Sequence, residues 1–201
     1  HRIEASLAPH FPKRRWRGAG TAVPVFSLRS RESFGVGEFA DLKLLVDWAV
    51  QTRQRVLQIL PVNDTSMTGS WEDSYPYNAV STFALHPQYL RLTAAGVEAD
   101  GEYLRLRDEL NALPEVDYER VNRAKQELLR QAFERDAGRT ARRREYRRFL
   151  ADNAHWLMPY AVFCSLRDTF HTADFSRWGE YARYDKACVE AYARSHRREI
   201  A

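Results

Sequence analysis

A nearly continuous apolar run constrains the fold of this chain more than any other stretch. Residues 56–62 read VLQILPV, with Gln58 as the one polar interruption. Such a run is typical of a strand that is buried on both faces, as strands of parallel sheets are. Residues 21–28 (TAVPVFSL) predict a second strand, and Pro24 within it must lie where no ladder hydrogen bond is needed.

An amphipathic helix is predicted between these two strands, over residues 38–52. Its apolar face is formed by Phe39, Leu42, Leu45, Val46 and Ala49, and its polar face by Asp41, Lys43, Asp47 and Gln51. Strand, helix and strand in this order predict a βαβ unit with two parallel strands and a right-handed crossover. Gly35 and Gly37, just before the helix, indicate that the backbone approaches another group closely there.

The chain changes character at about Asp100, after which its pattern is helical. Asp117 has the side chain of an N-cap, and Gly138 is expected to separate two helices. Pro159 is expected in the first turn of a later helix. The predicted helices are 103–112, 118–136, 139–152, Pro159 to Phe170 and 185–199. The predicted apolar faces are Val121, Leu128, Leu129, Ala132 and Phe133 in the second of these helices, and Val162, Phe163, Leu166 and Phe170 in the fourth.

Composition excludes several classes of function. The chain has 201 residues, is 44% hydrophobic and carries a net charge of +4, so it can bury a core and is not a disordered tail. Cys164 and Cys188 show neither CxxC nor metal-ligand spacing, which predicts free thiols in a reducing cytosol, with no metal and no cofactor. No apolar run approaches the roughly 18–20 residues that span a bilayer, so no membrane partner is expected.

Six arginines lie within residues 139–148 (RTARRREYRR). One interpretation is a face that binds nucleic acid or an acidic partner. The other is a solvated helix face, with Tyr146 and Phe149 turned inward. We favour the second for this run and for the basic residues 13–17, because no RNA- or DNA-binding motif accompanies them. No nucleic-acid partner is therefore predicted.

A polar and aromatic loop follows the second predicted strand. It begins with Asn63 and Asp64 and ends in Ser74-Tyr75-Pro76-Tyr77-Asn78. Aromatic rings beside amide and carboxylate groups suit a sugar, which has apolar faces and a rim of hydroxyls. The alternative is that the tyrosines simply cover the core.

Other polar residues predict no hydrolytic site. Ser27 and Ser74 have no neighbouring His and Asp arranged as a triad. His86, within Ala-Leu-His-Pro, is expected to be a hydrogen-bonded structural residue rather than a base or a ligand. Asp168 is expected at a helix end, away from any strand.

Several blocks of the sequence, in the same order, resemble the 4-alpha-glucanotransferases (amylomaltases, or disproportionating enzymes). The resemblance runs from about Arg17 to the end of the chain, and it is closest to the plant cytosolic type and its bacterial relatives. The blocks are Gly20–Ser30, Phe34–Phe39, Leu57–Asp64, Ser74–Leu90, Val116–Val121 and Tyr160–Phe163.

The resemblance implies an α/β fold: an incomplete (β/α)8 barrel with a large, mainly helical insertion. Residues 1–20 would be a lead-in segment, 21–92 the first βαβ part of the barrel, and 93–201 the insertion. The ligand of a barrel sits at the carboxyl ends of its strands, where residues 27–31 and 63–77 would lie. A cytoplasmic location is expected.

The resemblance also implies a malto-oligosaccharide or glucan substrate. In the family, the tyrosine of a Ser-Pro-Tyr motif helps to hold the glucan near the cleaved bond, and Tyr77 occupies that position here. Tyr75 replaces the family serine, whose hydroxyl contact Tyr75 or Ser74 would take over. Asn63, Asp64 and Asp73 are carried over as substrate-binding residues by position alone.

Retaining transfer of a glucosyl group needs two carboxylates about 5–5.5 Å apart, and the family adds a third. None of their motifs occurs in this chain, so its catalytic residues are expected downstream of Ala201. The chain is expected to be an N-terminal fragment of the catalytic domain, inactive alone. Its open strand edges are expected to pair with another copy, which gives a homo-oligomer, or to be capped locally. The alternatives are a non-catalytic carbohydrate-binding or accessory module and, less favoured, a helical nucleic-acid-binding module.

Overall fold

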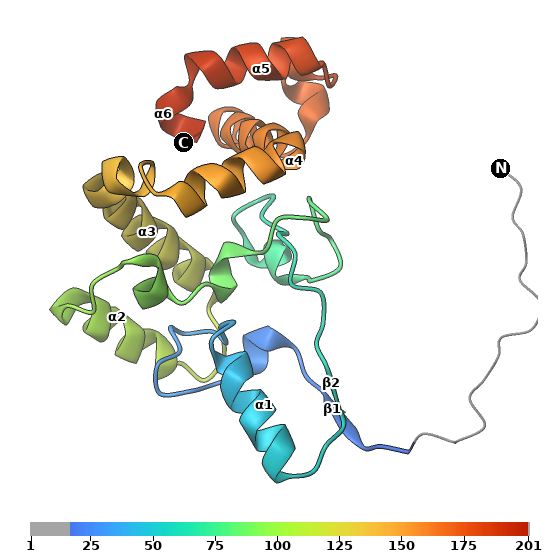
Figure 1. Ribbon diagram of the computed structural model, residues 1–201, viewed down its shortest axis with the longest axis vertical. Coiled ribbons are helices and arrows are strands. Elements are labelled where there is room, and N and C mark those ends of the chain that lie inside the picture. The colour runs from blue at the N-terminus through green and yellow to red at the C-terminus, as the bar shows by residue number, and fades with distance from the viewer. Residues whose placement is uncertain (1–16, 201) are drawn as a thin grey trace, which may run out of the picture.

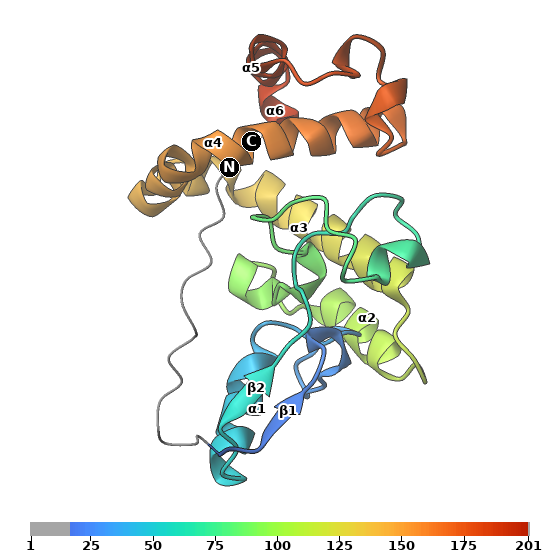
Figure 2. The same ribbon diagram turned by 90° about the vertical axis from the view of Figure 1, so that its right-hand side faces the viewer.

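The computed structural model describes residues 17–200, so most of the predicted lead-in segment lies outside the described residues. A short βαβ unit lies at one end of an elongated molecule, and the longer helices are stacked away from it (Figures 1 and 2). The strands are β1 (Gly20–Ala22) and β2 (Val56–Gln58). The helices are α1 (Asp41–Gln51), α2 (Gly101–Asn111), α3 (Tyr118–Thr140), α4 (Arg144–Phe170), α5 (Lys186–Ser195) and α6 (Arg197–Ile200). No helix in the described part of the chain is long and apolar enough to cross a membrane.

The predicted βαβ unit is confirmed. Strands β1 and β2 pair in parallel, with Thr21 opposite Leu57, and α1 connects them. The ladder ends where the N–H of Val23 donates to the carbonyl of Gln58 at 2.9 Å. Pro24 therefore lies just beyond the pairing, as its missing N–H requires.

The predicted lengths and burial of the strands are wrong. Each strand has three residues, and Val25–Ser27 forms a 3-10 turn where the first strand was expected to continue. Val56 is 46% exposed, although the run 56–62 was expected to be buried on both faces. Within residues 17–200 the sheet has these two strands alone, and a sheet so small buries little of either face.

Helix α1 buries less apolar surface than its pattern predicts. Ala49 is buried as expected, but Val46 is half exposed. Asp41 was assigned to the polar face and is buried instead, because it begins the helix and its carboxylate serves the preceding loop. Its carboxylate accepts hydrogen bonds from the hydroxyls of Ser30 (2.7 Å) and Ser33 (2.9 Å) and from the N–H of Glu38 (2.8 Å).

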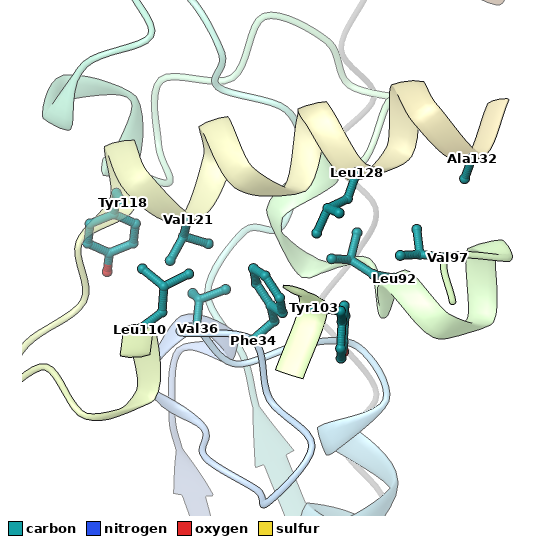
Figure 3. Close-up of a cluster of buried hydrophobic side chains, with 10 residues drawn as sticks. All are labelled: Phe34, Val36, Leu92, Val97, Tyr103, Leu110, Tyr118, Val121, Leu128 and Ala132. Atoms are coloured by element: carbon teal, nitrogen blue, oxygen red, sulfur yellow. The ribbon is translucent and has the colours of Figure 1, made fainter. Parts of the chain in front are cut away.

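The main core lies between the loop that precedes α1 and helices α2 and α3 (Figure 3). Gly35 lets that loop pass close to both helices: its φ is +70°, and a Cβ there would lie 2.7 Å from Val121 and 2.8 Å from Leu110. The predicted close approach of the backbone is thus confirmed, and its partner is the core itself. The buried cluster comprises Phe34, Val36, Leu92, Val97, Tyr103, Leu110, Tyr118, Val121, Leu128 and Ala132.

Helix α3 begins at Tyr118 and helix α4 ends at Phe170, as predicted, but the boundary between the two helices differs from the prediction. Asp117 caps α3 as expected, and its carboxylate accepts from the N–H of Arg120 at 3.0 Å. The predicted break between two helices is present, but it lies at residues 141–143 rather than at Gly138, because α3 continues to Thr140. Helix α4 is one element of 27 residues, and Pro159 lies inside it rather than at its start. A single glycine costs a helix only about 1 kcal/mol, and at Pro159 the packing of α4 against α5 overrides the local breaking preference.

A second cluster holds the far end of the molecule together. Val162 and Leu166 of α4, both in the predicted apolar face, pack with Tyr192 and Ala193 of α5. Trp178 lies between the two helices in sequence and belongs to the same cluster. Figures 1 and 2 both show α5 and α6 on the side of α4 that faces away from the βαβ unit.

A buried ionic cluster joins the βαβ unit to α3. Lys125 Nζ donates to Glu38 Oε1 at 2.6 Å and to the backbone carbonyls of Gln88 (2.7 Å) and Leu90 (2.9 Å). Arg91 donates to the other oxygen of Glu38 and to Asp41. Burial lowers the pKa of Lys125, and the charge of Glu38 opposes that shift. All three N–H donors of the Lys125 ammonium group are thus hydrogen-bonded within the protein interior.

Candidate functional site

Two buried aspartates shape the loop that follows β2. The carboxylate of Asp73 accepts from the N–H groups of Thr68 (3.0 Å) and Gly69 (2.8 Å) and from the Thr68 hydroxyl (2.9 Å). Asp73 lies within the short 3-10 turn Trp71–Ser74, which the side chain of Ser70 caps. The carboxylate thus closes the loop from within, and its predicted contact with a sugar stays a prediction.

Asp64 is 1% exposed and anchors the start of the same loop. Its carboxylate accepts from the N–H (3.0 Å) and the hydroxyl (2.7 Å) of Ser66 and from the phenol of Tyr160 at 2.6 Å. Asn63 is half-buried and pairs through its backbone with Leu85 in an isolated antiparallel bridge. These residues hold the loop in place, and their direct contact with a ligand also stays a prediction.

Tyr75 and Tyr77 do not cover the core. Their side chains are 61% and 62% exposed, with ring centroids 5.6 Å apart and planes tilted by 52°. Two such rings offer an apolar surface beside polar hydroxyls, which is the chemistry expected of a sugar contact.

A groove of about 540 Å³ brings part of the predicted site together. Ser74 and Tyr75 line it, whereas Tyr77, Asn63, Asp64 and Asp73 lie outside its lining. The loops after β1 and β2 meet the start of α3 there. The lining residues are Phe26, Ser27, Trp71, Glu72, Ser74, Tyr75, Pro76, Glu115, Val116 and Tyr118.

The aromatic wall of this groove was not predicted from the sequence. The ring of Tyr118 meets the rings of Phe26 and Trp71 edge-on, with centroids 6.0 Å and 5.0 Å away. The backbone N–H of Trp71 donates to Glu119 at 2.9 Å, which ties the loop to the first turn of α3. No local signal could show this, because Tyr118 lies far along the chain from Trp71.

Carboxylates complete the chemistry of the groove. Glu72 and Glu115 are both exposed and lie in its lining, beside aromatic and apolar surface. Carboxylates accept hydrogen bonds from hydroxyl groups, and aromatic faces cover the C–H faces of a pyranose ring. An open groove of this kind can hold a neutral polyhydroxylated ligand, but its described residues include no nucleophile paired with a base.

His86 has the structural role predicted for it. It is buried, its Nδ1 accepts from the N–H of Gln88 at 3.2 Å, and it caps the turn Pro87–Tyr89. Burial lowers the pKa of its imidazole, against the charges of Asp64 and Asp73, so the ring is neutral at pH 7.

The arginine-rich run lies on the surface, which both interpretations of its sequence require, so the expected absence of a nucleic-acid partner stays a prediction. The arginines from Arg139 to Arg148 are exposed. Arg139 and Arg148 form surface ion pairs with Asp136 and Asp152. The inward orientation predicted for Phe149 is wrong, because 49% of that residue is exposed. Among residues 17–200 no group of three or more His, Cys, Asp or Glu side chains could hold a metal ion.

The fold is similar to that of a solved amylomaltase. The structure of "Amylomaltase from Streptococcus agalactiae in complex with acarbose" matches with a TM-score of 0.72 and 24% identity. The match covers 92% of this chain and 37% of that protein. The likeness places the chain in the α/β class, although most of its own regular structure is helical.

Curated relatives agree with this likeness. A 4-alpha-glucanotransferase of rice (Oryza sativa subsp. japonica), called DPE2, is 46% identical over 177 residues. That alignment covers 85% of this chain and 18% of the rice protein. A 4-alpha-glucanotransferase of Chlamydia caviae is 37% identical over 164 residues, which are 79% of this chain and 30% of that protein.

The chain therefore spans less than a third of the length of each of these two relatives. The family model described as 4-alpha-glucanotransferase matches residues 23–201, which is nearly the whole chain. On this match, and on the relatives, the chain belongs to the 4-alpha-glucanotransferase family.

Proposed function

We propose that this chain is part of a cytoplasmic 4-alpha-glucanotransferase and forms one side of its glucan-binding cleft. The observation that carries the proposal is the groove lined by Trp71, Tyr75 and Tyr118, which lies where the loops after β1 and β2 meet α3. Family membership supports the substrate class, and the two free cysteines suit a reducing compartment. The ligand would be a malto-oligosaccharide or a longer alpha-1,4-glucan.

We propose further that β1 and β2 are the first two strands of a (β/α)8 barrel. Their parallel pairing, the connecting helix α1 and the position of the groove beyond their carboxyl ends support this arrangement. Residues 1–20 would lead in, 21–92 would belong to the barrel, and 93–201 would be a helical insertion. The barrel and insertion parts share one core, because Phe34 and Val36 pack with Leu110 and Val121.

The proposed reaction is a retaining transfer of glucosyl units or glucan segments. A carboxylate nucleophile would form a covalent glucosyl-enzyme, which an acceptor sugar would then attack in place of water. Both catalytic carboxylates would lie in parts of the relatives that this chain does not span, so this chain supplies binding and no catalysis. In this reaction Tyr77 would hold the glucan near the cleaved bond, with Tyr75 and Ser74 beside it.

Removal of a groove aromatic should weaken glucan binding. We expect Trp71→Ala and Tyr75→Ala each to raise the Kd for maltoheptaose about tenfold, because stacking and burial of one ring contribute about 1–2 kcal/mol. Tyr77→Ala tests the position that the family resemblance singles out. Titration of the 201-residue chain with maltoheptaose, monitored by calorimetry or by amide chemical shifts, measures the Kd.

The matched control is Tyr184→Ala. Tyr184 is 71% exposed and lies outside the groove, so its removal should leave the Kd unchanged. If Trp71→Ala, Tyr75→Ala and Tyr77→Ala all bind maltoheptaose as tightly as the wild type does, the glucan site lies elsewhere.

We propose that the separate chain assembles through the open edges of β1 and β2. Val56 and Ile59 are partly exposed, and β1 and β2 have no other strand beside them among residues 17–200. We expect the separate chain to self-associate through these edges, with a mass in light scattering that rises with concentration. Val56→Lys should reduce this association. A constant monomer mass for the wild type would contradict it.

A further inference from the structure

Helix α4 contacts the loop after β2 at two points. The hydroxyl of Tyr160 donates to Asp64 Oδ2 at 2.6 Å, and Nη1 of Arg167 donates to the carbonyl of Ser66 at 2.6 Å. Residues seven positions apart lie on the same face of a helix, about two turns from each other. Tyr160 and Arg167 thus hold two nearly adjacent residues of the loop from one helix face.

Both contacts are partly buried. Burial and the hydrogen bond to Asp64 raise the pKa of Tyr160, so its phenol keeps its proton and acts as a donor. The Arg167 side chain is largely buried, and its Nε donates to Asp168 at 2.8 Å, which fixes the orientation of the guanidinium. A hydrogen bond to a charged group away from water is stronger than one between neutral groups at the surface.

Two sets of hydrogen bonds, joined through the backbone of residues 64–66, lead from these two points to the groove. Ser66 is bonded to Asp64, and the hydroxyl of Thr65 donates to the carbonyl of Asp73. The carboxylate of Asp73 then holds Thr68 and Gly69. Asp73 belongs to the turn Trp71–Ser74, which presents Trp71 and, directly after it, Tyr75 to the groove.

We propose that Tyr160 and Arg167 are positioning residues that hold the groove loop, residues 64–75, in its ligand-binding conformation. They touch no groove surface themselves, and they act through Asp64 and Ser66. The helical part of the chain, beyond residue 93, is thereby a support for the binding loop. The effect on a glucan rests on the proposed function, whereas the effect on the loop does not.

The test compares two tyrosine hydroxyls, one on α4 and one on α5. Tyr160→Phe removes the bond to Asp64 and keeps the ring. Tyr192→Phe is the matched control, because the Tyr192 hydroxyl is bonded to Ser165 of α4 at 3.0 Å, within the second core cluster. Arg167→Met removes the bond to Ser66, and Arg167→Lys is the conservative variant that can still donate.

Amide hydrogen exchange of Thr68 and Gly69 in the 201-residue chain reports on the loop without a ligand. In Tyr160→Phe and Arg167→Met we expect these two amides to exchange at least about tenfold faster than the loss of global stability alone would produce. Tyr192→Phe should show no such excess, and Arg167→Lys should recover part of the protection. Equal exchange in Tyr160→Phe and Tyr192→Phe, after correction for stability, would overturn the proposal.

Maltoheptaose titration of the same variants adds the functional readout. We expect the Kd to rise about tenfold in Tyr160→Phe and to stay unchanged in Tyr192→Phe. If the wild type binds no glucan, the proposed function fails while the exchange result still decides the role of Tyr160 and Arg167. If the wild type binds and Tyr160→Phe binds equally well, the positioning role fails instead.

Discussion

Gly37→Ala is expected to prevent stable folding of this chain. A Cβ at this position would lie 1.9 Å from the carbonyl oxygen of Val25, and 2.8 Å and 2.9 Å from the carbonyl oxygen and nitrogen of Leu28. All three atoms belong to the backbone, so no change of rotamer relieves the overlap. The 3-10 turn Val25–Ser27 or the loop before α1 would have to move, and the loop carries the core residues Phe34 and Val36.

The expected loss exceeds about 4 kcal/mol, which is a large part of the roughly 5–15 kcal/mol that stabilises a domain. Denaturant unfolding followed by circular dichroism measures it. Gly138→Ala is the matched control, because nothing lies within 4 Å of a Cβ built there and the residue is helical. The free energy of unfolding of Gly138→Ala should rise by about 0.5–1 kcal/mol. A wild-type unfolding midpoint for Gly37→Ala would show that the turn moves without penalty.

Lys125→Met should have the second largest effect on stability. Lys125 is 1% exposed and Glu38 is fully buried, and their charged groups are 2.6 Å apart. Methionine fills the space but leaves Glu38 without its ammonium partner and the carbonyls of Gln88 and Leu90 without a donor. Loss of one member of a buried ion pair reduces the free energy of unfolding by about 3–5 kcal/mol.

Two further variants separate charge from packing. Glu38→Gln combined with Lys125→Met removes both charges of the pair, so we expect it to be more stable than Lys125→Met alone. Arg130→Met removes ion pairs to Glu127 and Glu134 that lie at the surface, and no measurable change is expected. If Lys125→Met were as harmless as Arg130→Met, the buried cluster would not hold α3 to the βαβ unit.

The elements that could be predicted from the sequence are those with short-range causes. The βαβ order follows from two apolar runs on either side of an amphipathic segment, and the structure confirms it. Asp117 could be identified as a cap because an N-cap bonds to an N–H only three residues ahead. Gly35 could be identified as a close approach because glycine is the residue that tolerates a positive φ with neighbours so near.

The errors arise where local preference and tertiary packing disagree. Gly138 and Pro159 both weaken a helix locally, yet α3 and α4 run through them. Packing of Val162 and Leu166 against α5 stabilises α4 by more than Pro159 destabilises it. The exposure of Val56 is a different kind of error, since an apolar run shows that burial is favourable without showing what covers it.

The candidate site was predictable in part. The loop from residue 63 to residue 77 could be recognised from its polar and aromatic composition, and the family resemblance directed attention to Tyr77. The buried roles of Asp64 and Asp73 could not be recognised, because a carboxylate in a loop has the same pattern whether it faces a ligand or the protein interior. Trp71 and Tyr118 were missed because their contact joins segments that are distant in the chain.

The sequence by itself determined the family, the βαβ order, the helical second half and the loop that carries the aromatic residues. These follow from periodicity, turn chemistry and motif order, all of which act over a few residues. Only the tertiary structure decided that Tyr118 completes the groove, that Lys125 joins α3 to Glu38, and that Tyr160 supports the loop through Asp64. Each of these depends on a contact between side chains more than 40 positions apart, and the free energy of such a contact is realised only when the whole chain is packed.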